Sequence, residues 1–309
     1  MHDHTHHTHH DHHDLAHARI GRAFAIGIAL NLAFVLFEWS YGVIAHSLAL
    51  IADAAHNLGD VLGLALAWGA SALARRPPSP RFTYGLRGST ILAALGNAML
   101  LLVMTGGIAW EAVLRMSGRA DPTDAHAVIW VAVLGVAINA ATAALFMRGS
   151  RHDLNVQGAY VHMAADAAIS AGVVLAGIGM VYTGWQWLDP FVSLAIVTVI
   201  FFGTWSLLRD SVRLALQAAP EKVDPVAVRR FLTELPGVAG VHDLHIWAMS
   251  TTDTALTVHL VLPGGHPGDE FLAATVCEIE SRFHINHATI QVETGAATQP
   301  CALEPDHVV

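Results

Sequence analysis

Six apolar stretches, each longer than 20 residues, limit this chain to very few folds. About 20 residues in a helix cross a hydrocarbon core of about 30 Å, and the connections between the stretches are short. Six buried helices of this length in one water-soluble protein are improbable, so we interpret the stretches as membrane spans. They cover residues 20–43, 47–73, 89–114, 125–147, 156–182 and 187–208.

Composition supports the same class. Charged residues make up only 13% of the chain and hydrophobic residues 54%, whereas soluble domains carry about 25% charged residues. The first span is too long for a cleaved signal peptide and lacks its flanks. Two cysteines, Cys277 and Cys301, exclude a disulfide framework and a zinc module of four thiolates.

Arginines indicate the orientation of the spans. With the N-terminus inside, the cytoplasmic flanks of the spans carry ten arginines, and the outer flanks carry only Arg115 and Arg119. Because cytoplasmic flanks are enriched in Lys and Arg, both termini are predicted to be cytoplasmic. We expect a multi-pass protein of a bacterial inner membrane, with the lipid bilayer as its surroundings.

The region after the sixth span is predicted to be a small α+β domain. Asp224 and Pro225 favour a helix start, and the pattern continues as strand, strand, helix and strand. The predicted elements cover residues 224–235, 241–249, 254–262, 267–283 and 288–292. The order αββαβ suits helices packed on one face of a sheet. From residue 211 onward the chain carries five basic and 12 acidic residues, a net charge of −7, which favours cations over nucleic acid as partners.

Ionisable residues inside two of the spans need a reason, because each costs about 2.5–3.5 kcal/mol near the bilayer centre. His56 and Asp60 lie four residues apart in the second span, and His162 and Asp166 lie four apart in the fifth. Each pair therefore occupies one helical face. From the span ends, both pairs are predicted to lie near the middle of the membrane.

Two imidazoles and two carboxylates at one depth fit a tetrahedral Zn²⁺ and neutralise its charge. The alternative is that each pair only forms hydrogen bonds between packed helices, but two pairs at matched depth favour the metal. Asp53, three residues before His56, has three interpretations: a partner of the metal ligands, a proton carrier, or a hydrogen bond between helices.

Three sequence segments then resemble one family. They are NLAFVLFEWSYGVIAHSLALIADAAHNLGD at 31–60, VHMAAD at 161–166 and VHDLHIW at 241–247, and they are similar to segments of the cation diffusion facilitator family. The resemblance implies a homodimeric exporter of divalent cations with six membrane helices and a cytoplasmic ferredoxin-like domain. It also implies that His56, Asp60, His162 and Asp166 form the transport site, in a form typical of the zinc-preferring branch.

Proton exchange follows from the chemistry of the ligands. Metal ligands must be deprotonated, so Zn²⁺ and protons compete for the same side chains, and a proton gradient can expel the metal. We therefore expect a proton-coupled antiporter that exports divalent cations, above all Zn²⁺, and no organic cofactor. The sequence leaves open whether one or two protons are exchanged.

Histidines outside the spans suggest accessory metal binding. Residues 2–17 contain nine of the 21 histidines, and this tract is predicted to be disordered and to capture metal weakly. In the C-terminal domain we predict a regulatory metal site formed by His245, His259, His287 and Glu293. Cys301 is a further candidate ligand, and Cys277 is interpreted as a small buried hydrophobic residue of a helix.

These observations predict four regions and leave two other functions to test. The regions are a His-rich tail at 1–18, a transport domain at 19–210, a metal-sensing and dimerisation domain at 211–295 and a flexible tail at 296–309. An intramembrane zinc enzyme would need an open ligand position and a separate base, and no HExxH motif is present. A metal sensor without transport would leave the buried His–Asp pairs unexplained.

Overall fold

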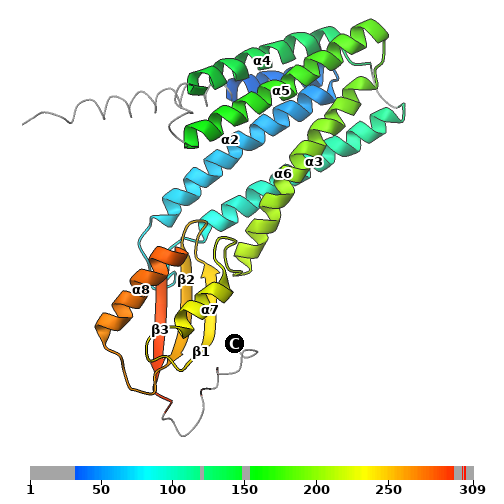
Figure 1. Ribbon diagram of the computed structural model, residues 1–309. Helices are drawn as coiled ribbons and strands as arrows, with labels where there is room; N and C mark the ends of the chain where they lie inside the picture. Colours follow the sequence, from blue (N-terminus) through cyan, green and yellow to red (C-terminus); the bar gives the residue numbers. More distant parts are fainter. Residues whose placement is uncertain (1–31, 119–121, 148–153, 296–300, 302, 304–309) are drawn as a thin grey trace, which may run out of the picture. The chain divides into compact units, whose positions relative to one another are not determined.

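A computed structural model describes residues 32–118, 122–147, 154–295, 301 and 303 (Figure 1). The chain divides into two compact units, which contain residues 1–64 with 99–205, and 65–98 with 206–309. Each unit is described by itself. The His-rich tail and residues 20–31 of the first predicted span lie outside the described residues.

Among the described residues, five helices are long and apolar enough to cross a membrane, and a sixth, shorter apolar helix precedes them. This confirms the predicted helical membrane class. The short helix covers Leu32–Ile44. The others are α2 (Leu48–Ala74), α3 (Ser89–Met116), α4 (Ala125–Met147), α5 (Leu154–Thr183) and α6 (Leu188–Ala215).

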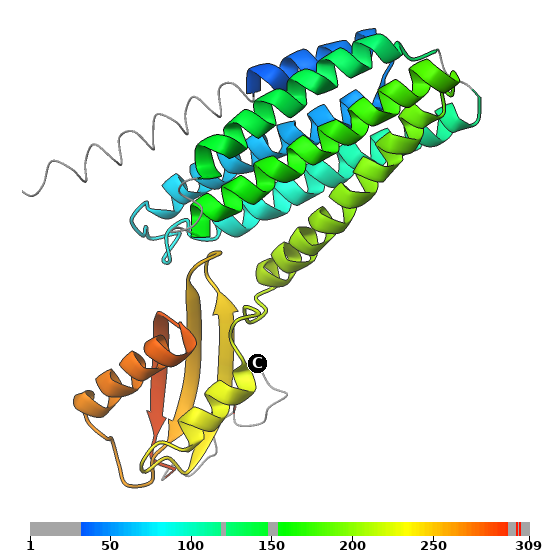
Figure 2. The same cartoon turned by 45° about the horizontal axis from the view of Figure 1, so that its top comes forward.

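Small residues hold the membrane helices together, and large apolar residues lie on their outer faces. The buried core includes Ala49, Ala52 and Ala132, whereas Trp68 and Trp130 are each 74% exposed. This distribution is expected in lipid, where close backbone packing rather than the hydrophobic effect drives helix association. Figures 1 and 2 both show α4 and α5 side by side.

Asp189, at the beginning of α6, fixes the beginning of α2. Its carboxylate accepts hydrogen bonds from the Ser47 hydroxyl at 2.5 Å and from the backbone N–H of Leu48 at 2.7 Å. Asp189 is fully buried, and it satisfies N–H groups that a helix start leaves without partners. The N-terminal ends of α2 and α6 therefore lie at the same end of the helix bundle.

The C-terminal domain has the predicted order of elements, shown in Figure 2. These are α7 (Pro225–Thr233), β1 (Gly240–Ala248), β2 (Thr254–Val261), α8 (Asp269–Phe283) and β3 (His287–Glu293). The Asp224 carboxylate caps α7 by accepting from Val226 N–H, as the Asp-Pro pair predicts. In the sheet, β1 pairs antiparallel with β2, and β2 pairs parallel with β3.

Alternation along β2 separates the two faces of this sheet. Leu256, Val258 and Leu260 belong to one buried cluster together with Leu232 of α7 and Ile279 of α8. Side chains alternate between faces along a strand, so residues such as Thr257 and His259 lie on the other face. Both helices therefore pack on one face of the sheet, which confirms the predicted α+β domain.

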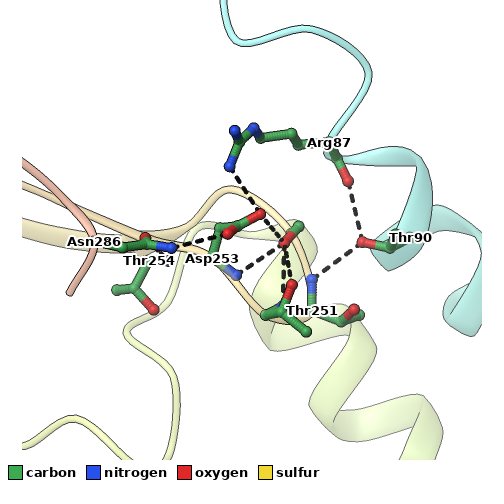
Figure 3. A network of polar contacts seen from close by, with 8 residues as sticks. Arg87, Thr90, Thr251, Asp253, Thr254 and Asn286 are labelled. Atoms are coloured by element: carbon green, nitrogen blue, oxygen red, sulfur yellow. Dashed lines mark hydrogen bonds and ion pairs between the residues drawn. The ribbon is translucent and has the colours of Figure 1, made fainter. Parts of the chain in front are cut away.

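A polar network joins the turn between β1 and β2 to the segment that precedes and begins α3 (Figure 3). The Arg87 guanidinium lies 3.0 Å from an Asp253 carboxylate oxygen, and Thr251 N–H donates to the Thr90 hydroxyl at 3.1 Å. Asp253 also accepts from Ser250 and Asn286, at 2.8 Å each. Burial acts to raise the pKa of Asp253, but these hydrogen bonds and Arg87 outweigh it and lower that pKa.

Candidate metal centres

The four candidate transport residues come together from α2 and α5. His56 and Asp60 lie one turn apart on α2, and His162 and Asp166 lie one turn apart on α5. Each histidine faces the carboxylate of the other helix: His56 Nε2 lies 3.4 Å from Asp166 Oδ1, and His162 Nε2 lies 3.2 Å from Asp60 Oδ2. The spacing of four puts each pair on one face of its helix, and the packing of α2 against α5 turns these two faces toward each other.

The distances fit a single small cation. Within each helix, the histidine nitrogen and the carboxylate oxygen are 3.8 Å apart on α2 and 3.7 Å apart on α5. Metal–ligand bonds of about 2.0–2.1 Å in a tetrahedron place the ligand atoms about 3.3–3.4 Å from one another. The four nitrogen–oxygen distances of 3.2–3.8 Å lie near or above this value, and they reach Asp60 through one oxygen but Asp166 through both. His56, Asp60 and Asp166 have ligand atoms within 4.8 Å of one another, and His162 would move closer to complete a site with four ligands.

Exposure of these side chains changes along the helix axes. The Asp166 side chain is 1% exposed and that of His56 is 20% exposed. Asp60 and His162, one turn nearer the C-terminal end of α2, are 30% and 43% exposed. The site is therefore closed toward the N-terminal end of α2 and more open in the opposite direction.

Asp53 forms a buried hydrogen bond rather than a fifth metal contact. The Ser170 hydroxyl of α5 donates to Asp53 Oδ2 at 2.7 Å, and both side chains are fully buried. Of the three interpretations that the sequence left open for Asp53, this contact agrees with a bond between helices.

A second cluster of ligand atoms lies on the sheet face opposite α7 and α8. His242, His259, Glu293 and Cys301 each offer one ligand atom, all within 4.8 Å of one another. His259 is central: its Nδ1 lies 3.0 Å from Glu293 Oε1 and 3.8 Å from the Cys301 sulfur. His242 Nε2 lies 3.4 Å from Glu293 Oε2. Imidazole, thiolate and carboxylate are all donors that Zn²⁺ accepts.

This cluster contains only part of the set predicted from the sequence. His259 and Glu293 are present, but His287 pairs with Ala255 in the sheet, four positions along β2 from His259. At about 3.3 Å per residue, four positions separate the two histidines by about 13 Å. The His287 ring instead lies against Tyr84, with 5.4 Å between ring centroids.

His245 lies next to the cluster and contacts it through Asp243. His245 Nε2 is 2.8 Å from one Asp243 oxygen, and His259 Nε2 is 3.3 Å from the other. Asp243 sits in a bulge of β1 and has φ of +51°. The carboxylate therefore orients two imidazoles, a role that residues beside a metal site commonly play.

Sequence reasoning left His242 out of the predicted set. The bulge between His242 and His245 breaks the alternation of β1, so spacing within this strand does not tell which histidine shares a face with His259. The β1–β2 register does, because it pairs His242 directly with His259.

Charge around Glu293 also favours a cation. Burial acts to raise its pKa, but the hydrogen bonds from Cys301 and Gln291 and the proximity of His242 and His259 outweigh burial, and the pKa of Glu293 is lowered. Glu293 is thus held as an anion beside two imidazoles.

Comparisons with known proteins agree with this architecture. Residues 24–214 match the cation efflux transmembrane domain, and residues 220–295 match the cytoplasmic domain of cation efflux proteins. The chain is 37% identical to the metal cation efflux system protein CzcD of Cupriavidus metallidurans over 284 residues, which cover 92% of this chain and 90% of the relative.

Two further relatives have similar coverage. The zinc transporter ZitB of Escherichia coli is 34% identical over 302 residues, covering 97% of this chain and 93% of its own. A cadmium, cobalt and zinc/H(+)-K(+) antiporter of Bacillus subtilis is 30% identical over 268 residues, covering 85% of this chain and 86% of its own.

Fold, sites and comparisons define a multi-pass membrane transporter with a cytoplasmic α+β domain, not an enzyme. The chain belongs to the cation efflux family, also called the cation diffusion facilitator family, which confirms the resemblance seen in the sequence. Its function is the efflux of divalent cations.

Proposed function

We propose that this protein exports Zn²⁺ in exchange for protons, and that His56, Asp60, His162 and Asp166 are the transport site. The observation that carries the proposal is the convergence of two imidazoles and two carboxylates between α2 and α5, where each histidine faces the carboxylate of the other helix. Relatives named as a zinc transporter and as a zinc/H(+)-K(+) antiporter support the substrate and the coupling.

The chemistry of the four ligands provides the coupling. Both imidazoles must lose their N–H⁺ proton at the coordinating nitrogen before Zn²⁺ binds, so the metal releases protons on binding and protons expel it. When the site faces the cytoplasm, Zn²⁺ displaces protons; when it faces outside, the inward proton gradient returns them. The rise in exposure toward Asp60 and His162 corresponds to a site open on the cytoplasmic side.

The alternative functions fit the geometry less well. Four protein ligands leave no open position for a catalytic water on a tetrahedral zinc. A sensor without transport gives no role to the two charged pairs that α2 and α5 hold inside the membrane domain.

Zinc flux into proteoliposomes under an imposed pH gradient tests this proposal. Asp60→Ala and Asp166→Ala each remove one ligand and are expected to lower flux at least about 100-fold, a loss of about 2.7 kcal/mol. Asp210→Ala removes an exposed carboxylate of α6 and serves as the matched control. Native flux in either ligand variant, with the protein eluting as folded particles, would contradict the assignment.

We also propose that His242, His259, Glu293 and Cys301 bind a regulatory Zn²⁺ in the cytoplasmic domain, with His245 held beside it by Asp243. The donor set and its mutual distances support this site. His287 is not part of the proposed set. Three further proposals concern the organisation of the chain. The domains extend over 19–210 and 211–295, the protein is a homodimer, and the nine histidines of the tail at 1–18 capture metal weakly.

A further inference from the structure

A buried acidic cluster lies next to the proposed transport site without belonging to it. Its members are Glu38 of helix Leu32–Ile44, Asp53 and Asn57 of α2, and Ser170 of α5. Glu38, Asp53 and Ser170 are fully buried and Asn57 is 1% exposed. Buried carboxyl groups inside a membrane domain are costly and point to a function.

Glu38 lacks the partners that buried polar groups normally have. Its carboxyl group lies within reach of the Asp53 and Asn57 side chains, yet among the described residues no bond of good hydrogen-bond geometry is made by its two oxygens, by Asp53 Oδ1 or by the Asn57 amide. The large majority of buried side-chain polar atoms in proteins have a hydrogen-bond partner. Several unsatisfied oxygens at one point therefore mark a site for a positively charged ligand.

The cluster lies on the outer side of the transport site. The domain after α6 is cytoplasmic, so the N-terminal end of α6, and the end of α2 that Asp189 caps, are outside. Asp53 precedes His56 by three residues on α2, and Ser170 follows Asp166 by four on α5. At 1.5 Å per residue, both lie about 4.5–6 Å outward of the transport site.

Among the described residues, His56 of the proposed transport site is the one group facing this pair that can carry a positive charge. The titratable groups that face Asp53 are Glu38, His56 and Asp166, and Asp53 is the one that faces Glu38. Helix α4 packs here through Gly135, where an added Cβ would meet Phe34 and Ser170 at 2.9 and 3.3 Å. Along its described length α4 brings only one ionisable side chain, the exposed His126 near its start.

Glu38 and Asp53 bring two carboxyl groups together away from water, an arrangement that can hold one proton between them. The cluster offers only oxygen and amide ligands of its own, whereas Zn²⁺ sites in proteins commonly include imidazole or thiolate ligands. A metal ion at His56 would repel that proton across one helical turn, because charges interact strongly where water is excluded.

We propose that Glu38, paired with Asp53, carries one of the protons that the antiporter exchanges for its metal. This inference rests on the proposed antiport. An O–H bond forms on the Glu38 carboxylate when a proton arrives from outside and the metal leaves. The same bond breaks, and the proton moves on toward the cytoplasm, when the next metal binds. Glu38 touches no metal and acts as a proton-carrying residue.

Proteoliposomes that report zinc and proton movement together test this proposal. Glu38→Gln keeps the shape of the side chain but cannot exchange a proton. It is expected to lower the number of protons moved per Zn²⁺ by one, and to change the zinc KM by less than about threefold. Glu38→Asp should restore the native ratio. The matched control Glu111→Gln alters an acid 47% exposed on α3, which pairs with Arg115, and should leave the ratio native.

The outcomes separate this inference from the proposed function. If the native protein moves zinc without protons, the proposed antiport itself fails. If the native protein is coupled and Glu38→Gln keeps the native ratio, the proton-carrying role of Glu38 is overturned. Should Glu38→Gln not fold, carbodiimide labelling of the native protein decides, because the reagent modifies protonated carboxyl groups in apolar surroundings. Label on Glu38 or Asp53 supports the proposal, and its absence from both overturns it.

Discussion

The two candidate metal centres use similar residues on different secondary structures. In the membrane domain, two histidines and two carboxylates come from facing helices. In the cytoplasmic domain, two histidines, a carboxylate and a thiol come from three strands and the chain beyond them. Helix periodicity is a local property, so a spacing of four already identifies a shared face. Strand partners are set by register between distant segments, which spacing alone does not give.

Transport flux should separate the two centres most sharply. His56→Ala removes a ligand of the proposed transport site and is expected to lower zinc flux at least about 100-fold at neutral pH. His259→Ala removes the central residue of the cytoplasmic cluster, which lies outside the membrane helices. Its flux at saturating zinc should stay within about threefold of native. Equal losses in both variants, measured in the same proteoliposome assay, would mean that the comparison between the centres is wrong.

Cobalt spectroscopy should distinguish the ligand sets by a smaller, spectroscopic effect. Only the cytoplasmic cluster offers a sulfur ligand, so Co²⁺ bound there should show a thiolate-to-cobalt charge-transfer band. Cys301→Ser is expected to abolish this band, and His242→Ala to weaken cobalt binding by roughly 10- to 100-fold.

Two control variants sharpen the cobalt experiment. Cys277 of α8 is exposed, so the prediction that it is buried was wrong. Cys277→Ser should leave the band intact. His287→Ala should also leave cobalt binding unchanged, because His287 lies four positions along the sheet from His259. A band that survives Cys301→Ser but disappears with Cys277→Ser would reverse the assignment.

Asp253 gives the smallest expected effect, and it concerns stability rather than metal. The pKa of Asp253 is lower in the folded protein than the ordinary value of an aspartate. The ionised carboxylate therefore stabilises the fold fully above the ordinary pKa, and this stabilisation is lost as the pH falls through the lower pKa of the folded state. The Arg87–Asp253 pair is partly exposed, so Asp253→Asn should cost at most about 1 kcal/mol at neutral pH. The difference from the native protein should shrink as pH falls below 4, as measured by thermal unfolding. A difference that grows with acid would contradict the role of the ionised carboxylate.

Much of the architecture followed from the sequence because its signals are local. The apolar stretches predicted the membrane helices, and the Asp224–Pro225 pair predicted the start of α7. The two HxxxD pairs indicated the four side chains that α2 and α5 bring together. Each of these depends on residues within one or two helical turns.

Other features could not be predicted because they depend on distant pairing. Asp189 caps α2 from 141 residues away, and His242 joins His259 through the β1–β2 register. The pairing of Glu38 with Asp53 is of the same kind, because a sequence does not show which side chains of two different helices meet.

Zinc X-ray absorption tests the central claim most directly when the other zinc ligands are removed. The sample is the full chain lacking residues 2–17 and carrying His259→Ala and Cys301→Ser, loaded with one equivalent of Zn²⁺. The account predicts a four-coordinate zinc with only nitrogen and oxygen ligands at about 2.0–2.1 Å, lost on acidification and absent when Asp166→Asn is added. A zinc that keeps the same spectrum in the Asp166→Asn protein would contradict it.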